Sequence, residues 1–140
     1  MSLQEKSIWI SLVVTLLIFG YYFASAFRVF SDPAADQTKL IGLFIGAVVL
    51  MIIIEAVLHI VLAIAFKREA EKSEDERDKV IDLRARRISY FVLSFGVWTM
   101  GISVLVDASP LELATIMMFF FILAEAVGFS TQLFYYRRGI

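Results

Sequence analysis

Four long apolar stretches, separated by short polar segments, constrain the fold of this chain more than any other feature. They cover residues 7–29, 40–66, 88–106 and 113–136. Each is close to or above the roughly 20 residues that an α-helix needs to cross the hydrocarbon core of a bilayer. The composition agrees, since 60% of the residues are hydrophobic, against about 45–50% in soluble domains. The sequence therefore predicts an all-α membrane protein with four transmembrane helices.

Polar residues that flank these stretches extend the expected helices. We expect a single four-helix transmembrane domain of residues 1–140, with helices over about 7–29, 38–66, 74–106 and 110–136. The first stretch is interpreted as a retained helix and not as a cleaved signal peptide. The reason is that Tyr21, Tyr22 and Phe23 stand where a cleavage site has small residues.

The uneven distribution of basic residues predicts how the chain is oriented. Only Arg28 and Lys39 fall on one side of a four-pass topology, and the other 11 of the 13 Lys and Arg residues fall on the opposite side. Because Lys and Arg are retained on the cytoplasmic side, we expect a multi-pass protein of the plasma (inner) membrane with both termini cytoplasmic. The formal net charge of −1 provides no basic surface for nucleic acid. The absence of cysteine excludes disulfides and thiolate metal sites.

The central cytoplasmic segment, residues 67–87, is dense in charge of both signs. Within it, Ser73-Glu74-Asp75-Glu76 matches the S-x-x-E capping box, in which the two end residues satisfy each other's backbone N–H groups. This motif predicts that the third helix begins near residue 74. The helix would then extend about three or four turns into the cytoplasm from the membrane.

Two i,i+4 ion pairs, Asp75–Lys79 and Asp82–Arg86, are expected to stabilise this extension. The extension either packs on its neighbour as a salt-bridged helix or forms a docking surface for a protein or a lipid headgroup. The residues assigned to such a surface are Asp75, Glu76, Arg77, Asp78, Asp82 and Arg84.

Residues 75–85, Asp-Glu-Arg-Asp-Lys-Val-Ile-Asp-Leu-Arg-Ala, form the only stretch with a recognisable family pattern. They resemble the D-E-R-x-x-x-I-x-x-[KR]-A pattern of small multi-pass prokaryotic membrane proteins of unknown function. The match covers 11 of the 140 residues. The resemblance implies a protein of a prokaryotic plasma membrane, and it carries no activity or site residue over to this chain.

A short motif shared by the second and fourth stretches predicts an internal repeat. Glu55-Ala56-Val57 is followed by Lys67-Arg68 twelve residues after the glutamate, and Glu125-Ala126-Val127 is followed by Arg137-Arg138 at the same spacing. The two stretches also run in the same direction across the membrane.

The first and third stretches match more weakly, at Ile10-Ser11 with Ile88-Ser89 and at Phe19-Gly20 with Phe95-Gly96. Together the matches predict two tandem two-helix hairpins, related by an axis along the membrane normal, as in some transporters.

Three ionisable side chains inside the predicted spans form the candidate site. Glu55 and Glu125 are each about 18 Å of helix from the inner basic residues, which predicts a position near the bilayer midplane. His59 follows Glu55 by one helical turn and lies on the same face. Because a charged side chain there costs about 2.5 kcal/mol or more, we expect all three to face the protein interior. Trp98 and Gln132 are the further polar side chains expected to support the site.

These side chains are compatible with more than one function. A pair of buried carboxylates can hold a proton or a cation, which predicts proton- or cation-linked transport or ion binding. Glu55, His59 and Glu125 are also adequate ligands for a divalent metal ion. A proton site built from the same residues needs no cofactor, and this is the favoured alternative. The same groups could instead act as hydrogen-bonding glue between helices. No motif of a known enzyme class is present, and a membrane enzyme with an intramembrane acid/base pair remains a further alternative.

The other alternative is a regulatory or scaffolding membrane protein that acts through its charged cytoplasmic helix. Its partners would be the lipid bilayer, a cytoplasmic protein or a second copy of the chain. Gly42 and Gly46 form a G-x-x-x-G motif that permits close helix approach, either within the bundle or in a homodimer.

Overall fold

The protein is described by a computed structural model that covers residues 3–32, 34, 36–65 and 76–138. These residues form four α-helices: α1 (Leu3–Ser31), α2 (Gln37–Ala65), α4 (Glu76–Leu105) and α5 (Pro110–Arg138). All four helices are long and apolar enough to cross a membrane. At about 1.5 Å per residue, helices of this length reach about 44 Å, so each exceeds the roughly 30 Å hydrocarbon core. The predicted helix bounds differ from the observed ones by at most four residues.

The turn between α4 and α5 shows how the sequence sets the helix ends. Asp107 has a positive φ of 59°, the left-handed conformation that commonly terminates a helix. α5 then begins at Pro110, whose fixed φ suits the first helical position. The N–H of Glu112 donates to Ser109 Oγ, and the N–H of Ser109 donates to Glu112 Oε2. This reciprocal capping box fixes the start of α5.

Asp36 caps the start of α2 in a simpler way. The N–H of Thr38 donates to Asp36 Oδ1 at 2.9 Å, as expected for an aspartate at the N-cap. Hydrogen bonds from Thr38 hold the pKa of the Asp36 carboxyl below its ordinary value. The stabilisation from this cap is therefore complete above the ordinary aspartate pKa, and it is lost as the pH falls through the lowered one.

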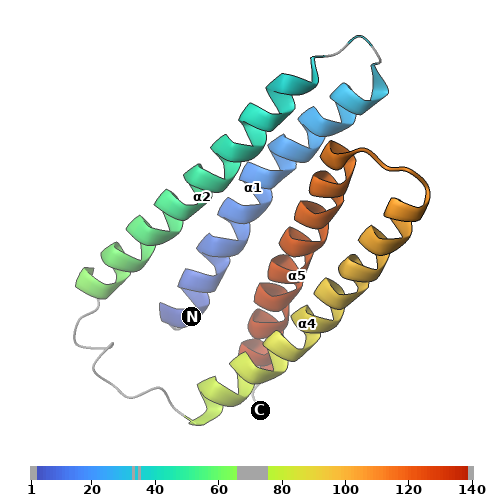
Figure 1. Ribbon diagram of the computed structural model, residues 1–140. Helices are drawn as coiled ribbons and strands as arrows, with labels where there is room; N and C mark the ends of the chain where they lie inside the picture. Colours follow the sequence, from blue (N-terminus) through green and yellow to red (C-terminus); the bar gives the residue numbers. More distant parts are fainter. Residues whose placement is uncertain (1–2, 33, 35, 66–75, 139–140) are drawn as a thin grey trace.

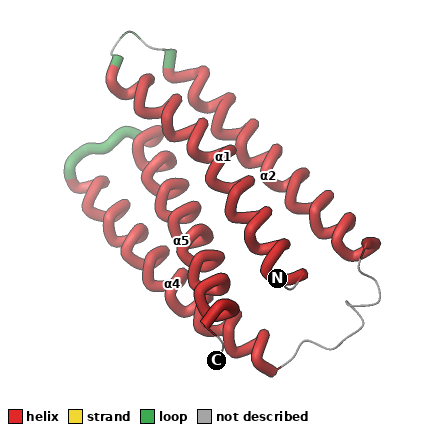
Figure 2. The backbone as a smooth tube through the Cα atoms, turned by 180° about the vertical axis from the view of Figure 1, so that it is seen from behind, coloured by secondary structure: helices red, strands yellow, loops and turns green. Residues whose placement is uncertain are grey.

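The helices pack in the order α2, α1, α5, α4, so that α2 and α4 lie on the outside. α2 packs on α1, α1 packs on α5 and α5 packs on α4, as Figure 1 and Figure 2 show. Within the most apolar part of α1, 33% of the residues are buried inside the bundle. The corresponding share is 6% in α2 and 6% in α4. The start of α1, the end of α2, the start of α4 and the end of α5 lie at one end of the bundle, here called the terminal end.

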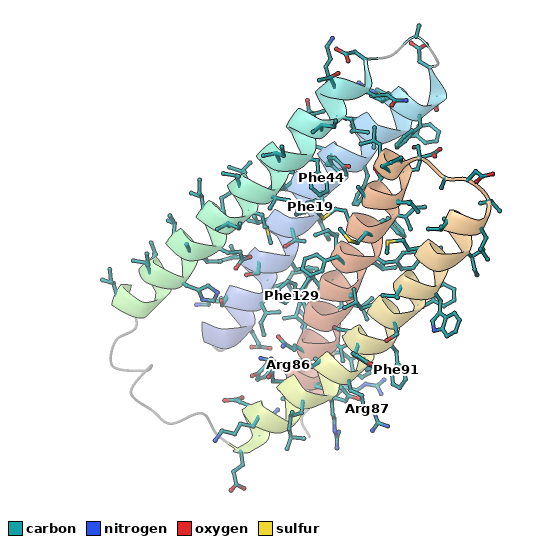
Figure 3. All side chains as sticks on the ribbon, in the orientation of Figure 1. Phe19, Phe44, Arg86, Arg87, Phe91 and Phe129 are labelled. Atoms are coloured by element: carbon teal, nitrogen blue, oxygen red, sulfur yellow. The ribbon has the colours of Figure 1, made fainter. Side chains whose placement is uncertain are left out.

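Aromatic side chains form the core where α1, α2 and α5 meet. Tyr22 is only 1% exposed, and its ring packs edge-on against Phe23 and Phe44. Its hydroxyl lies 3.3 Å from Thr115 Oγ1 on α5. Tyr22 therefore connects α1 with both of its neighbours. Phe19 and Phe44 are labelled in this region in Figure 3.

The charged start of α4 lies along the last turns of α5. Tyr136 Oη donates to Asp78 at 2.9 Å, and Gln132 Nε2 donates to Asp82 at 3.1 Å. Of the two alternatives for this segment, these contacts favour the one in which it packs on its neighbour, because the C-terminal part of α5 offers hydrogen-bonding partners to its carboxylates. The capping box that includes Ser73 and Asp75 lies outside the described residues.

Candidate functional site

Glu55 is the most enclosed ionisable side chain of the predicted site. It lies on the face of α2 that packs against α1, where Ser11 Oγ donates to its Oε2 at 3.3 Å. The other carboxylate oxygen, Oε1, is buried and has no hydrogen-bond partner within the described part of the chain. An ionised carboxylate with an unsatisfied oxygen in an apolar helix pair is unfavourable. Such a group is stabilised when it binds a proton or a cation.

His59 lies beside Glu55, as the i,i+4 spacing predicts. Its Nε2 is 3.7 Å from Glu55 Oε2. The imidazole itself is 73% exposed, whereas the Glu55 side chain is 24% exposed. The prediction that His59 faces the interior of the chain is therefore wrong, because at this turn α2 presents only the glutamate to α1.

Glu125 lies on α5, beside α4. Ser89 Oγ donates to the carbonyl oxygen of Ala124 at 2.8 Å, which fixes α4 next to the Glu125 turn. The electrostatic neighbours of the Glu125 carboxylate are Glu55 and Arg86. Unlike Glu55, Glu125 is an exposed residue. The two glutamates thus interact through their charges while they belong to different helix pairs.

A polar groove connects Glu125 to the terminal end of the bundle. Asp82 lies at its centre, because it accepts hydrogen bonds from Arg86 Nε at 2.7 Å and from Gln132 at 3.1 Å. Asp82, Arg86 and Gln132 line two cavities, of about 510 and 490 Å³. The first cavity also contains Asp78 and Tyr136, and the second contains Glu125.

Figure 3 shows the orientation of this groove. Arg86 lies on the side of α4 that turns towards the rest of the bundle, whereas Arg87 and Phe91 point away from it. The polar surface is therefore directed between the helices, and neighbouring residues of α4 face outward.

The packing places Glu125 closer to charged residues than the sequence indicates. Along α5, Glu125 precedes Arg137 by twelve residues, or about 18 Å. Ser89, which bonds to α5 at Ala124, follows Arg86 on α4 by only three residues, or about 4.5 Å of helix. The charged part of α4 runs beside α5, so Glu125 lies about one helical turn from the charged segment.

The other predicted residues differ in how they relate to this site. Gln132 supports the groove, as expected. Trp98 does not, because its side chain is on the outer face of α4 and is 75% exposed. No group of three or more His, Cys, Asp or Glu residues that could hold a metal ion is found among the described residues. The metal site expected from Glu55, His59 and Glu125 thus lacks a converging ligand set.

Three residues of the predicted cytoplasmic surface contact α5, so they are only partly available to a partner. Asp78 and Asp82 accept hydrogen bonds from α5, and the Arg84 guanidinium lies 5.5 Å from the centre of the Tyr135 ring. Glu76 and Arg77 are exposed. Asp75 lies outside the described residues.

Sequence reasoning did not assign Ser11, Ser89 or Tyr136 to the site. Ser11 carries one signal, because Ser7, Ser11 and Thr15 form a stripe of small residues on one helix face, which indicates close packing. Which helix that stripe contacts depends on the tertiary fold. Comparison with family models, curated proteins and solved structures gives no match to this chain.

Proposed function

We propose that this chain is a small proton-linked membrane protein that binds a proton at Glu55. The observation that carries the proposal is the buried, unpartnered Oε1 of Glu55, opposite an Oε2 that accepts a hydrogen bond from Ser11. A proton on Oε1 removes the charge from the apolar span and leaves Oε2 as the acceptor. One proton therefore relieves the unfavourable ionisation without further ligands.

A proton suits this environment better than a metal ion does. Hard cations such as Ca²⁺ and Mg²⁺ bind about six or more oxygen atoms. Glu55 is bonded to Ser11 and lies near His59, and the described residues include no metal-binding cluster. The His59 imidazole lies 3.7 Å from Glu55 Oε2, so a bridging water would let a proton pass between the two side chains.

The polar groove provides a route by which protons reach Glu125. It begins at Asp78 and Tyr136 and continues past Asp82 and Arg86 to Glu125. Glu55 is among the charged neighbours of Glu125, so the groove ends close to the proposed proton site. We propose that this groove opens to the cytoplasm.

Proton movement in proteoliposomes tests this function. The wild-type protein, reconstituted with a pH-sensitive dye inside the vesicles and driven by a K⁺ diffusion potential, is expected to acidify or alkalinise the lumen faster than empty vesicles. Glu55→Gln keeps the shape of the side chain and should reduce the rate to that of empty vesicles. Glu76→Gln, which removes an exposed carboxylate at the start of α4, should retain the wild-type rate. A wild type no faster than empty vesicles, or a Glu55→Gln variant as fast as the wild type, contradicts the proposal.

We propose that the terminal end faces the cytoplasm of a prokaryotic cell. The support is the excess of Lys and Arg at this end and the resemblance of residues 75–85 to small prokaryotic membrane proteins. Reporters fused after residue 140 or inserted near residue 73 should read as cytoplasmic, and one inserted near residue 35 should read as external. An external C-terminus would overturn this orientation.

We also propose that the chain is a tandem repeat of two helix hairpins. The sequence matches Ser11 with Ser89 and Glu55 with Glu125. Ser11 bonds to Glu55 across α1 and α2, and Ser89 bonds to Ala124, the residue before Glu125, across α4 and α5. Both matched serines thus lie beside the turn that carries the matched glutamate, which supports a common hairpin register.

A further inference from the structure

The outer faces of α2 and α4 are apolar and are left open by the packing within the chain. α2 packs on α1 and α4 packs on α5, at opposite ends of the helix row. The glycines of these helices other than Gly96 lie in open space. A Cβ added at Gly42, Gly46 or Gly101 would meet no atom within 4 Å. Small residues of this kind allow two transmembrane helices to approach closely.

We infer that a second copy of this chain covers these faces, with α2 of one copy packed on α4 of the other. The inference rests on the proposed repeat and is independent of the proton site. The repeat equates α1 with α4 and α2 with α5. The observed contact between α1 and α5 therefore has a counterpart between α4 and α2, and only another copy can supply it.

The burial of matched positions supports this counterpart. Ser89 follows Ser11 by 78 residues, and Glu125 follows Glu55 by 70. The offset of 78 residues matches Phe19, which is 3% exposed, with Val97, which is 62% exposed. The weaker Phe19–Phe95 match, offset by 76 residues, also pairs Phe19 with an open side chain, since Phe95 is 65% exposed. Residues that match across the repeat are thus enclosed on α1 but open on α4.

The same holds for the second helix of each hairpin. The offset of 70 residues matches Ile122 on α5, which is 6% exposed, with Ile52 on α2, which is 62% exposed. Both halves of the missing contact are therefore present on the surface of one chain. Two copies complete the contact twice, as α2 with α4 and α4 with α2, so the assembly closes as a twofold dimer.

The aromatic contact between α1 and α5 identifies the residues that should meet. Phe23 and Phe119 have ring centroids 5.6 Å apart. Their matched positions are Gly101 on α4 and Val49 on α2, both of which are exposed. We expect these two residues to face each other across the dimer.

Cysteine cross-linking tests this pairing directly, because the chain contains no cysteine. A Val49→Cys chain and a Gly101→Cys chain with different tags are reconstituted together in membranes and oxidised. A disulfide should join the two tags in the mixture, whereas each variant alone should remain monomeric on a denaturing gel. Ala24→Cys, at an exposed position on α1, should give no product with Gly101→Cys.

Other results overturn the inference. Cross-linking of Val49→Cys alone would indicate a symmetric α2 contact, and the absence of any product would indicate that lipid covers both faces. A chain that carries both cysteines should give a covalent dimer as its largest species. A ladder of larger products would contradict closure.

A second set of variants checks the interface without cysteines. Gly101→Leu should convert the detergent-solubilised dimer to monomer in light scattering, because the added side chain fills the proposed contact. Gly20→Leu is the matched control, since Gly20 also has no atom within 4 Å of an added Cβ and lies on α1. A Gly101→Leu protein that stays dimeric, or a wild type that is monomeric in membranes and detergent, contradicts the dimer.

Discussion

Replacement of Gly96 by leucine is expected to force α4 away from α5 and to destabilise this helix pair strongly. A Cβ at this position would overlap Cβ and Cγ of Phe120. These atoms are close to the α5 backbone, so a side-chain rotation cannot relieve the overlap. Overpacking of a well-packed core typically costs about 1–3 kcal/mol, and we expect Gly96→Leu to reach or exceed the upper end of this range.

The loss of stability is measured as the change in the free energy of unfolding, by titrating the protein in mixed micelles with a denaturing detergent. Gly20→Leu serves again as the control, because it meets no atom within 4 Å, and its free energy should stay within about 0.5 kcal/mol of the wild type. Gly128→Ala is expected to have an intermediate effect. Its Cβ would lie 2.5 Å from Ser89 Oγ, and that hydroxyl can rotate away at the cost of its hydrogen bond to Ala124, worth about 1 kcal/mol. Equal stability of Gly96→Leu and Gly20→Leu would contradict the observed packing of α4 on α5.

The existence of the four helices follows from the sequence because a membrane imposes a simple requirement. A span must satisfy its own backbone hydrogen bonds and must be long and apolar enough to cross the core. The order of the helices does not follow. Faces that contact lipid are as apolar as faces that contact another helix, so the apolar pattern does not mark α1 and α5 as the inner pair.

Local contacts of the site were predictable, and contacts between helices were not. The Glu55–His59 proximity and the Asp82–Arg86 ion pair follow from i,i+4 spacing, and the structure confirms both. The bond from Gln132 to Asp82 spans 50 residues of sequence and depends on the register between α4 and α5. The outward position of Trp98 depends on how α4 rotates against α5, which periodicity alone leaves open.

Protonation of Glu55 at neutral pH is the second large effect that we expect. The carboxyl lies between two apolar helices, and its Oε1 has no partner among the described residues. Ionisation at such a position costs about 2.5 kcal/mol or more, which favours the neutral form relative to a glutamate in water. Infrared spectroscopy separates the two forms, because a protonated carboxyl has a carbonyl stretch that the carboxylate lacks.

Infrared spectra of the protein in bilayers at neutral pH therefore test the proposed proton site most directly. The wild type and Glu76→Gln should both show the protonated-carboxyl band, and Glu55→Gln should lose it. The spectrum of Glu125→Gln shows whether the second glutamate contributes to the same band. A wild-type protein with only ionised carboxylates, or a band that persists unchanged in Glu55→Gln, would contradict a proton held at Glu55.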